Sequence, residues 1–81
     1  HGIGRTLHEE PAVPGRGKSG EGEAIREGLV IAIEVIYNFG KHPVFLDRDG
    51  WTIKTGDGRI SGLFERTVAI TKTGPRILTP V

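Results

Sequence analysis

The chain has 81 residues, of which 11 are Lys or Arg and 10 are Asp or Glu, so its formal net charge is +1. A chain of this length buries only about 60% of its surface on folding, which leaves one small core and excludes two domains. The near-zero charge excludes a strongly basic nucleic-acid binder, the lack of cysteine excludes disulfides and thiolate metal sites, and no apolar run is long enough to span a membrane.

The start of the chain is unusual. The sequence contains no methionine and begins with His1 inside a glycine-containing motif. We therefore expect the chain to be a piece of a longer protein, in which case the lack of a signal peptide is uninformative.

The first half of the chain is predicted to hold an irregular loop and a long strand. Glycines gather in residues 14–28, which predicts a surface loop, with one helical turn at residues 24–27. Residues 29–37 (LVIAIEVIY) are rich in β-branched side chains and apolar on both faces. This pattern predicts a buried strand.

The second half is predicted to form short strands joined by tight turns. The predicted strands are residues 44–46, 51–55, 63–71 and 76–78. Between them lie the turns Asp49-Gly50, Gly56-Asp57-Gly58 and Gly74-Pro75, of which the second is a strong hairpin signal. Successive strands with short connections predict an antiparallel sheet. No long amphipathic helix is available to cover this sheet, although a sheet with an apolar face needs a second layer.

Glu34 stands in the middle of the most apolar predicted strand. A carboxylate buried there without a partner is costly, so the position needs an explanation. A structural ion pair, an exposed place on a sheet edge and a metal ligand all remain open for Glu34.

Glu65 repeats this pattern in the predicted strand at residues 63–71, and its neighbour Arg66 points to the opposite face. His1 adds an imidazole beside a flexible Gly2, although a core histidine or a frayed chain end would also explain it. One His and two Glu form a donor set that suits Mn, Fe(II), Co or Zn. Three ligands are too few for two metal ions, so such a site would be incomplete in this chain.

Other motifs carry weaker chemical signals. His8-Glu9-Glu10-Pro11 lacks the second histidine of a zinc helix, so Glu9 and Glu10 are interpreted as loop charges and His8 as a polarising or proton-handling group. Residues 12–19 loosely match a P-loop, but a Glu-Glu-Pro turn precedes them where a strand is required, so their cations are interpreted as solvated. The acidic turn at residues 47–50 is too short for an EF-hand. Trp51 is interpreted as core in preference to the wall of a pocket.

Several of these pieces occur in one specific order along the chain. The motifs are His-Gly-Ile-Gly-Arg-x-x-His-Glu-Glu-Pro at 1–11, Gly-Leu-x-x-x-Ile-Glu at 28–34, Asp-Gly-Trp-Thr-x-x-Thr-x-Asp-Gly at 49–58, Ser-x-x-Phe-Glu-x-Thr-Val at 61–68 and Gly-x-x-Ile-Leu-Thr at 74–79. Together they closely resemble the C-terminal part of a type I methionine aminopeptidase, and the resemblance covers essentially all 81 residues.

The resemblance implies an α+β pita-bread fold, of which residues 1–81 would be the C-terminal part of a single catalytic domain, mostly antiparallel β with a glycine-rich loop. It also implies a cytoplasmic enzyme that removes the initiator methionine by means of two divalent metal ions. His1, Glu34 and Glu65 match three of the family's five metal ligands, and the two Asp ligands would lie upstream. The chain alone is therefore expected to have little or no activity.

The resemblance also implies roles for residues outside the ligand set. Glu34 would shuttle a proton, and His8 would contact the substrate and stabilise the tetrahedral intermediate. Leu7 and Trp51 match positions that hold the methionine side chain, and Ser61 matches a serine whose carbonyl binds a monovalent cation. The expected partners are the N-termini of nascent polypeptides and the ribosome, without nucleic acid or membrane, and a monomer is expected.

Four departures from the family pattern leave the ligand set intact. Val35 and Ile36 follow Glu34 where a proline is usual, Arg66 replaces a histidine, Leu7 replaces an aromatic residue, and Gly62-Leu63 replaces Ala-Gln. The Arg66 charge bears on the tuning of any bound metal. Two alternatives remain: another pita-bread hydrolase such as an X-Pro peptidase, and a relative that keeps the fold but only binds a partner.

Overall fold

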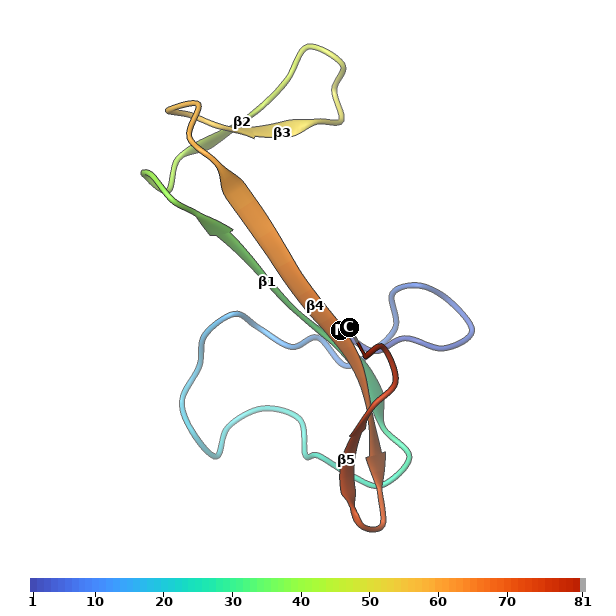
Figure 1. The fold of residues 1–81 in the computed structure, drawn as a ribbon. Coiled ribbons are helices and arrows are strands. Elements are labelled where there is room, and N and C mark those ends of the chain that lie inside the picture. Colours follow the sequence, from blue (N-terminus) through green and yellow to red (C-terminus); the bar gives the residue numbers. More distant parts are fainter. Residues whose placement is uncertain (81) are drawn as a thin grey trace. The chain divides into compact units, whose positions relative to one another are not determined.

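The computed structural model describes residues 1–80, which form strands, turns and irregular segments (Figure 1). The strands of the described chain are β1 (Val30–Asn38), β2 (Val44–Leu46), β3 (Ile53–Thr55), β4 (Ser61–Thr71) and β5 (Gly74–Ile77). No part of residues 1–80 forms an α-helix, and no helix there could cross a membrane.

The predicted strand positions agree with the structure to within two residues at most ends. The predicted helical turn at residues 24–27 is wrong, because these residues lie in a segment without helix or strand. Gly20, Gly22 and Gly28 in and beside this segment have φ between +83° and +91°, which interrupts any helical path.

The strands form two sheets instead of the single antiparallel run that the turns predicted. One sheet has the order β1-β4-β5, and the other pairs β2 with β3. Backbone bonds from Gly28 to Ile70 and from Phe39 to Ile60 show that β1 and β4 run antiparallel. The hairpin predicted at Gly56-Asp57-Gly58 is therefore wrong: a turn is present, but β3 pairs backwards with β2 while β4 joins the other sheet.

The described chain divides into two compact units. Unit 1 contains His1–Glu34 and the chain from Glu65 onward, and unit 2 contains Val35–Phe64. In unit 1 the hairpin of β4 and β5 pairs Val68 with Ile77 and Thr71 with Gly74. In unit 2 the β2–β3 hairpin pairs Val44 with Thr55 and Leu46 with Ile53.

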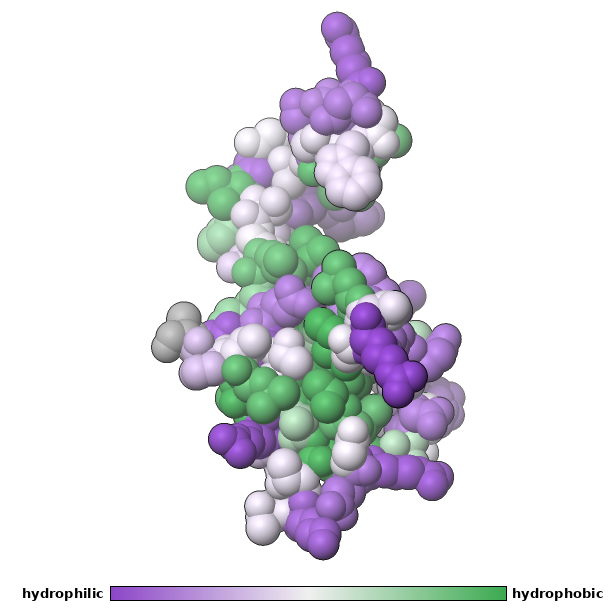
Figure 2. Space-filling view, turned by 90° about the vertical axis from the view of Figure 1, so that its right-hand side faces the viewer, coloured by the Kyte–Doolittle hydropathy of each residue, from purple (hydrophilic) through white to green (hydrophobic). Residues whose placement is uncertain are grey.

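The buried core of the described residues is very small. Ile31 and Ala32 are the buried hydrophobic residues, at 8% and 1% exposure, and both belong to the first half of β1. Ile33, Val35 and Ile36 on the same strand are exposed, so the prediction of a strand buried along its whole length is wrong. Figure 2 shows apolar side chains at the molecular surface. The physical reason is that residues 1–80 supply no second layer over the β1-β4-β5 sheet.

Trp51 is also not part of a core. It is 87% exposed and lies in a bend two residues before β3. The carboxylate of Asp49 accepts hydrogen bonds from the backbone N–H of Trp51 at 2.9 Å and of Thr52 at 2.8 Å. This turn delays the start of the strand, so the predicted alternation from residue 51 begins only at Ile53.

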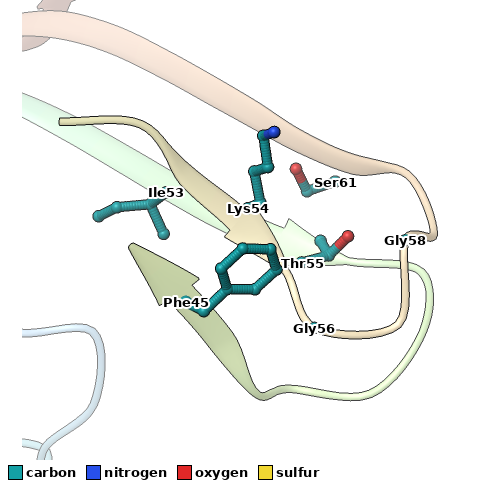
Figure 3. Close-up of a pocket in the computed structure, with 7 residues that line it drawn as sticks. All are labelled: Phe45, Ile53, Lys54, Thr55, Gly56, Gly58 and Ser61. Carbon is teal, nitrogen blue, oxygen red and sulfur yellow. The ribbon is translucent and has the colours of Figure 1, made fainter. Parts of the chain in front are cut away.

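A shallow depression in unit 2 lies beside the β2–β3 hairpin (Figure 3). Its lining residues are Phe45, Ile53, Lys54, Thr55, Gly56, Gly58 and Ser61. Lys54 is paired with Asp47 at 2.6 Å, which ties the end of β2 to β3. The Asp47 carboxylate is therefore a structural partner of a lysine, in keeping with the rejection of a calcium loop.

Asp57 joins two turns of unit 2. Its carboxylate accepts hydrogen bonds from the backbone N–H of Lys41 at 2.8 Å and of Arg59 at 3.0 Å. A Cβ on Gly40 would collide with this carboxylate, so a glycine is required at the point of closest approach. The two backbone N–H groups hold the pKa of Asp57 below its usual value of 3.8.

This geometry predicts an acid-dependent loosening of the Asp57 turn. Because the folded pKa is below 3.8, the stabilisation is present above the unfolded pKa and is lost as the pH falls through the folded pKa. In an acid titration followed by NMR, the backbone amide of Lys41 should change with a midpoint below 3.8, and Asp57→Asn should abolish the change. A midpoint at or above the usual value would contradict the bonding seen here.

Candidate metal centre

The N-terminal residues lie along the first half of β1 and place His1 beside it. Gly2 forms a β-bridge with Ile31, and Ala32 N–H donates to the His1 carbonyl at 2.7 Å. Gly2 also bridges to Glu9, so this short segment is held on both sides. A backbone fixed in this way gives the His1 side chain a defined starting point.

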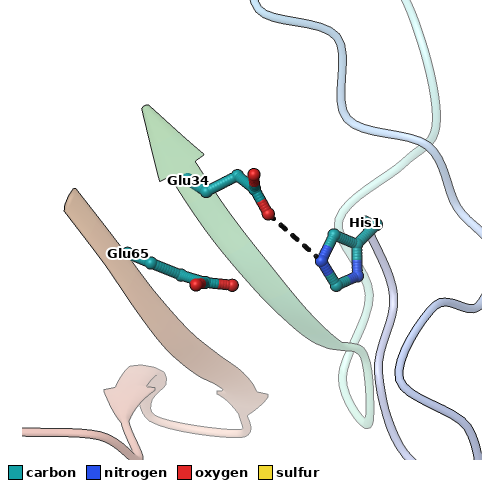
Figure 4. A group of neighbouring side chains, drawn as sticks. All are labelled: His1, Glu34 and Glu65. Atoms are coloured by element: carbon teal, nitrogen blue, oxygen red, sulfur yellow. Dashed lines mark ion pairs between the residues drawn. The ribbon is translucent and has the colours of Figure 1, made fainter. Parts of the chain in front are cut away.

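Three predicted residues converge in unit 1. His1 lies beside β1, Glu34 is on β1 and Glu65 is on β4, and Figure 4 shows their side chains pointing toward one another. One nitrogen or oxygen atom of each side chain lies within 4.8 Å of those of the other two. The structure therefore brings together the set that the sequence singled out, while its binding of metal stays a prediction.

The imidazole of His1 has a defined hydrogen-bonding role. Its Nδ1 lies 2.8 Å from the carbonyl oxygen of Gly2, which can only accept, so Nδ1 carries the hydrogen. Nε2 faces the Glu34 carboxylate at 3.4 Å (Figure 4). In the neutral imidazole Nε2 is then an acceptor facing another acceptor, which a proton or a cation between them would stabilise.

The charges of the centre also fit a cation. Within residues 1–80, the His1 imidazole is the one side-chain group that the structure pairs with either carboxylate. Two carboxylates held near each other repel unless a positive charge lies close by. Ligand bonds of about 2.0–2.2 Å to nitrogen and oxygen would place two neighbouring donors about 3 Å apart, close to the separation of Nε2 and the carboxylate. The three residues therefore fit a divalent ion.

The burial expected for these carboxylates is not found. The side chain of Glu34 is 37% exposed, that of His1 is 19% exposed, and Glu65 is exposed. The prediction of a buried Glu34 is wrong for the same reason as that of a buried strand: the described chain has no layer over this part of the sheet. The exposure leaves the carboxylates accessible to an ion.

A second histidine lies next to the centre. The ring centroids of His1 and His8 are 4.4 Å apart, and the rings are tilted by 54°. His8 and Leu7 are both exposed and belong to a tight loop that returns to Gly2 through Glu9. The loop thus places an imidazole beside the predicted ligand His1.

The remaining predicted site residues are less informative. Trp51 and Ser61 belong to unit 2 and are exposed. Ser61 begins β4 and lines the depression of Figure 3. The roles of Leu7, Trp51 and Ser61 stay predictions. Arg16 and Lys18 are exposed in an irregular segment, without the strand and helix that a P-loop needs.

Sequence reasoning missed Glu9, whose carboxylate it took for an ordinary loop charge. Oε1 of Glu9 accepts the backbone N–H of Thr6 at 2.8 Å, and the Glu9 N–H donates to the Gly2 carbonyl at 2.9 Å. The signal that was available is the spacing of Thr6 and Glu9, since a carboxylate three residues after Thr is the capping-box spacing. It was overlooked because no helix is predicted there.

Comparison with known proteins gives consistent matches. The sequence pattern of the metallopeptidase family M24 matches residues 1–72. A methionine aminopeptidase of Clostridium perfringens is 49% identical over 79 residues, covering 98% of this chain and 32% of the relative. One from Aquifex aeolicus is 49% identical over 81 residues, covering 98% of this chain and 31% of the relative.

Solved structures agree with these sequence matches. The crystal structure of a methionine aminopeptidase from Thermotoga maritima has a TM-score of 0.89 and 43% identity, and the match covers 100% of this chain and 32% of that one. That from Rickettsia prowazekii has a TM-score of 0.87 and 38% identity, covering 99% and 33%. The chain therefore spans about a third of the length of the relatives that it matches.

Proposed function

Because the chain belongs to metallopeptidase family M24, we propose that the polypeptide containing it is a methionine aminopeptidase, which removes the initiator methionine from new proteins. The observation that carries this proposal is the convergence of His1, Glu34 and Glu65 in a chain 49% identical to methionine aminopeptidases. The complete fold would be the α+β pita-bread fold, with residues 1–81 as the C-terminal part of one catalytic domain.

His1, Glu34 and Glu65 would hold divalent metal ions, with Co, Mn, Fe and Zn as the candidates. When bound, such ions act as Lewis acids on a carbonyl and activate water as a nucleophile. Two ions need more ligands than these three residues, so we propose that two further carboxylates come from outside residues 1–81.

The chain's own residues would handle the proton and the substrate. The Glu34 carboxylate would take a proton at its oxygen and return it to the leaving amine. His8 would donate a hydrogen bond to the oxygen of the scissile carbonyl, where negative charge develops. Leu7 and Trp51, both exposed in the described chain, would contact the methionine side chain, and the Ser61 carbonyl would bind a monovalent cation.

The proposed substrates are the N-termini of nascent polypeptides, encountered at the ribosome in the cytoplasm by a monomeric enzyme. An alternative specificity, that of an X-Pro peptidase, predicts a different preferred substrate. A relative that only binds a partner would cleave neither kind of peptide.

The proposal is tested by peptide cleavage with the full-length polypeptide that contains residues 1–81. We expect release of methionine from a Met-Ala-Ser peptide, no cleavage of an Ala-Pro peptide, loss of activity in EDTA and recovery with Mn²⁺ or Co²⁺. Residues 1–81 alone should show little or no turnover. Preferential cleavage of the Ala-Pro peptide would support the X-Pro alternative, and no cleavage of either peptide with metal bound would overturn the proposed activity.

A further inference from the structure

The loop that carries His8 is closed by the side chain of Glu9. Oε1 of Glu9 accepts the Thr6 N–H at 2.8 Å, and the Thr6 hydroxyl lies 3.4 Å from the same oxygen. The Thr6 hydroxyl also donates to the His8 carbonyl at 3.0 Å. One carboxylate oxygen thus lies at the centre of the bonds that shape residues 6–8.

The burial of the loop supports the same assignment. Residues 4–8 are exposed, whereas Glu9 is half-buried. A Cβ on Gly4 would lie 3.2 Å from Oε2 of Glu9, so the carboxylate packs against the inner side of the loop. The backbone of Glu9 is held separately, through the N–H that it donates to the Gly2 carbonyl at 2.9 Å.

That separation allows the side chain to be tested without disturbing the ligand. The Gly2 carbonyl that accepts the Glu9 N–H also accepts Nδ1–H of His1. Removing the Glu9 carboxylate leaves both of these bonds in place and frees only the segment that carries Leu7 and His8. The ring of His8, 4.4 Å from that of His1, is what then loses its support.

We infer that Glu9 is a positioning residue: its carboxylate, by accepting the Thr6 N–H, holds the His8 imidazole beside His1. The importance of His8 for turnover rests on the proposed function, but the position of the His8 ring does not. An acceptor at this place is sufficient, so glutamine should replace glutamate, whereas methionine, which has a similar length and no strong acceptor, should not.

The inference is tested by NMR on the full-length polypeptide loaded with diamagnetic Zn²⁺, using a nuclear Overhauser contact between the rings of His1 and His8. We expect the contact in the parent and in Glu9→Gln, and its loss in Glu9→Met. Glu10→Met is the matched control, since Glu10 is exposed and its neighbouring carboxylate makes no hydrogen bond within the described residues, and it should keep the contact. Retention of the contact in Glu9→Met would overturn the inference.

Kinetics on the Met-Ala-Ser peptide give a second readout. For Glu9→Met we expect kcat to fall by about 10–100-fold, the range for residues that orient a site, with Zn²⁺ affinity changed less than about twofold. Glu9→Gln should restore kcat. If the parent does not cleave the peptide but the ring contact still depends on Glu9, the positioning role stands and the proposed function fails. An unchanged kcat in Glu9→Met, with an active parent, would overturn the inference.

If Glu9→Met does not fold, hydrogen exchange in the parent decides the question. The Thr6 amide should be protected relative to the exposed amides of Arg5 and Leu7, because its hydrogen is bonded to the carboxylate. Exchange of Thr6 as fast as that of these neighbours would show that the bond is not held, and would overturn the inference.

Discussion

Glu65→Gln is expected to lower the Mn²⁺ affinity of the full-length polypeptide by at least about a hundredfold while leaving its fold intact. Residues that only orient metal ligands cost 10–100-fold in affinity when changed, so loss of a direct carboxylate ligand should reach the upper end of that range or exceed it. Glutamine has nearly the same shape but no charge. Isothermal titration with Mn²⁺ measures the affinity, and urea denaturation measures the free energy of unfolding.

The stability measurement separates a ligand from a structural ion pair. Glu65 is exposed and has no basic side-chain partner within residues 1–80, so its neutralisation removes only repulsion from Glu34. We expect the metal-free variant to be as stable as the parent or slightly more so. Glu27→Gln, a change in an exposed loop, is the control and should alter neither quantity. Unchanged Mn²⁺ affinity in Glu65→Gln would rule out Glu65 as a ligand.

The predicted ligand set could be found from the sequence because its chemistry conflicts with its surroundings. Glu34 and Glu65 interrupt apolar strands, where a carboxylate is unfavourable without a reason. The structure brings them to within 4.8 Å of each other and of His1. A local conflict between residue type and strand pattern was therefore a good guide to a site.

The pairing of the strands could not be found in this way. The Gly56-Asp57-Gly58 signal correctly indicates a turn, but a turn specifies only a local reversal of the chain. Which strand becomes the neighbour depends on contacts between residues far apart in sequence, such as Gly28 with Ile70. The long β4 finds its partners in β1 and β5, and the three-residue β3 pairs with β2.

Burial was the least predictable property. The apolar pattern of residues 29–37 correctly predicts a strand, but whether its side chains are buried depends on what covers the sheet. Similarly, the composition of residues 4–9 shows only a polar loop. That Glu9 is half-buried and bonded to Thr6 follows from the path of the backbone around Gly2 and Gly4.

Gly2→Ala is expected to destabilise the fold by about 1–3 kcal/mol, the usual cost of forcing an extra methyl group into a packed position. A Cβ on Gly2 would lie 2.1 Å from the carbonyl oxygen and 2.7 Å from the carbonyl carbon of Glu10. Both atoms are backbone, so no side-chain rotation relieves the clash, and the returning strand of the loop has to move. Urea denaturation of the full-length polypeptide measures the loss.

The same substitution should also weaken the metal centre, because Gly2 holds its neighbour His1 in two ways. Its carbonyl accepts Nδ1–H of His1, and its bridge to Ile31 places the His1 backbone beside β1. We therefore expect Mn²⁺ affinity to fall by about 10–100-fold together with stability. Gly15→Ala is the matched control: no atom lies within 4 Å of its Cβ position, so it should be neutral or stabilise by up to about 1 kcal/mol through the unfolded state. Equal effects of the two substitutions would show that the close approach at Gly2 does not constrain the centre, whereas loss at Gly2 alone ties the geometry of His1 to a position where only glycine fits.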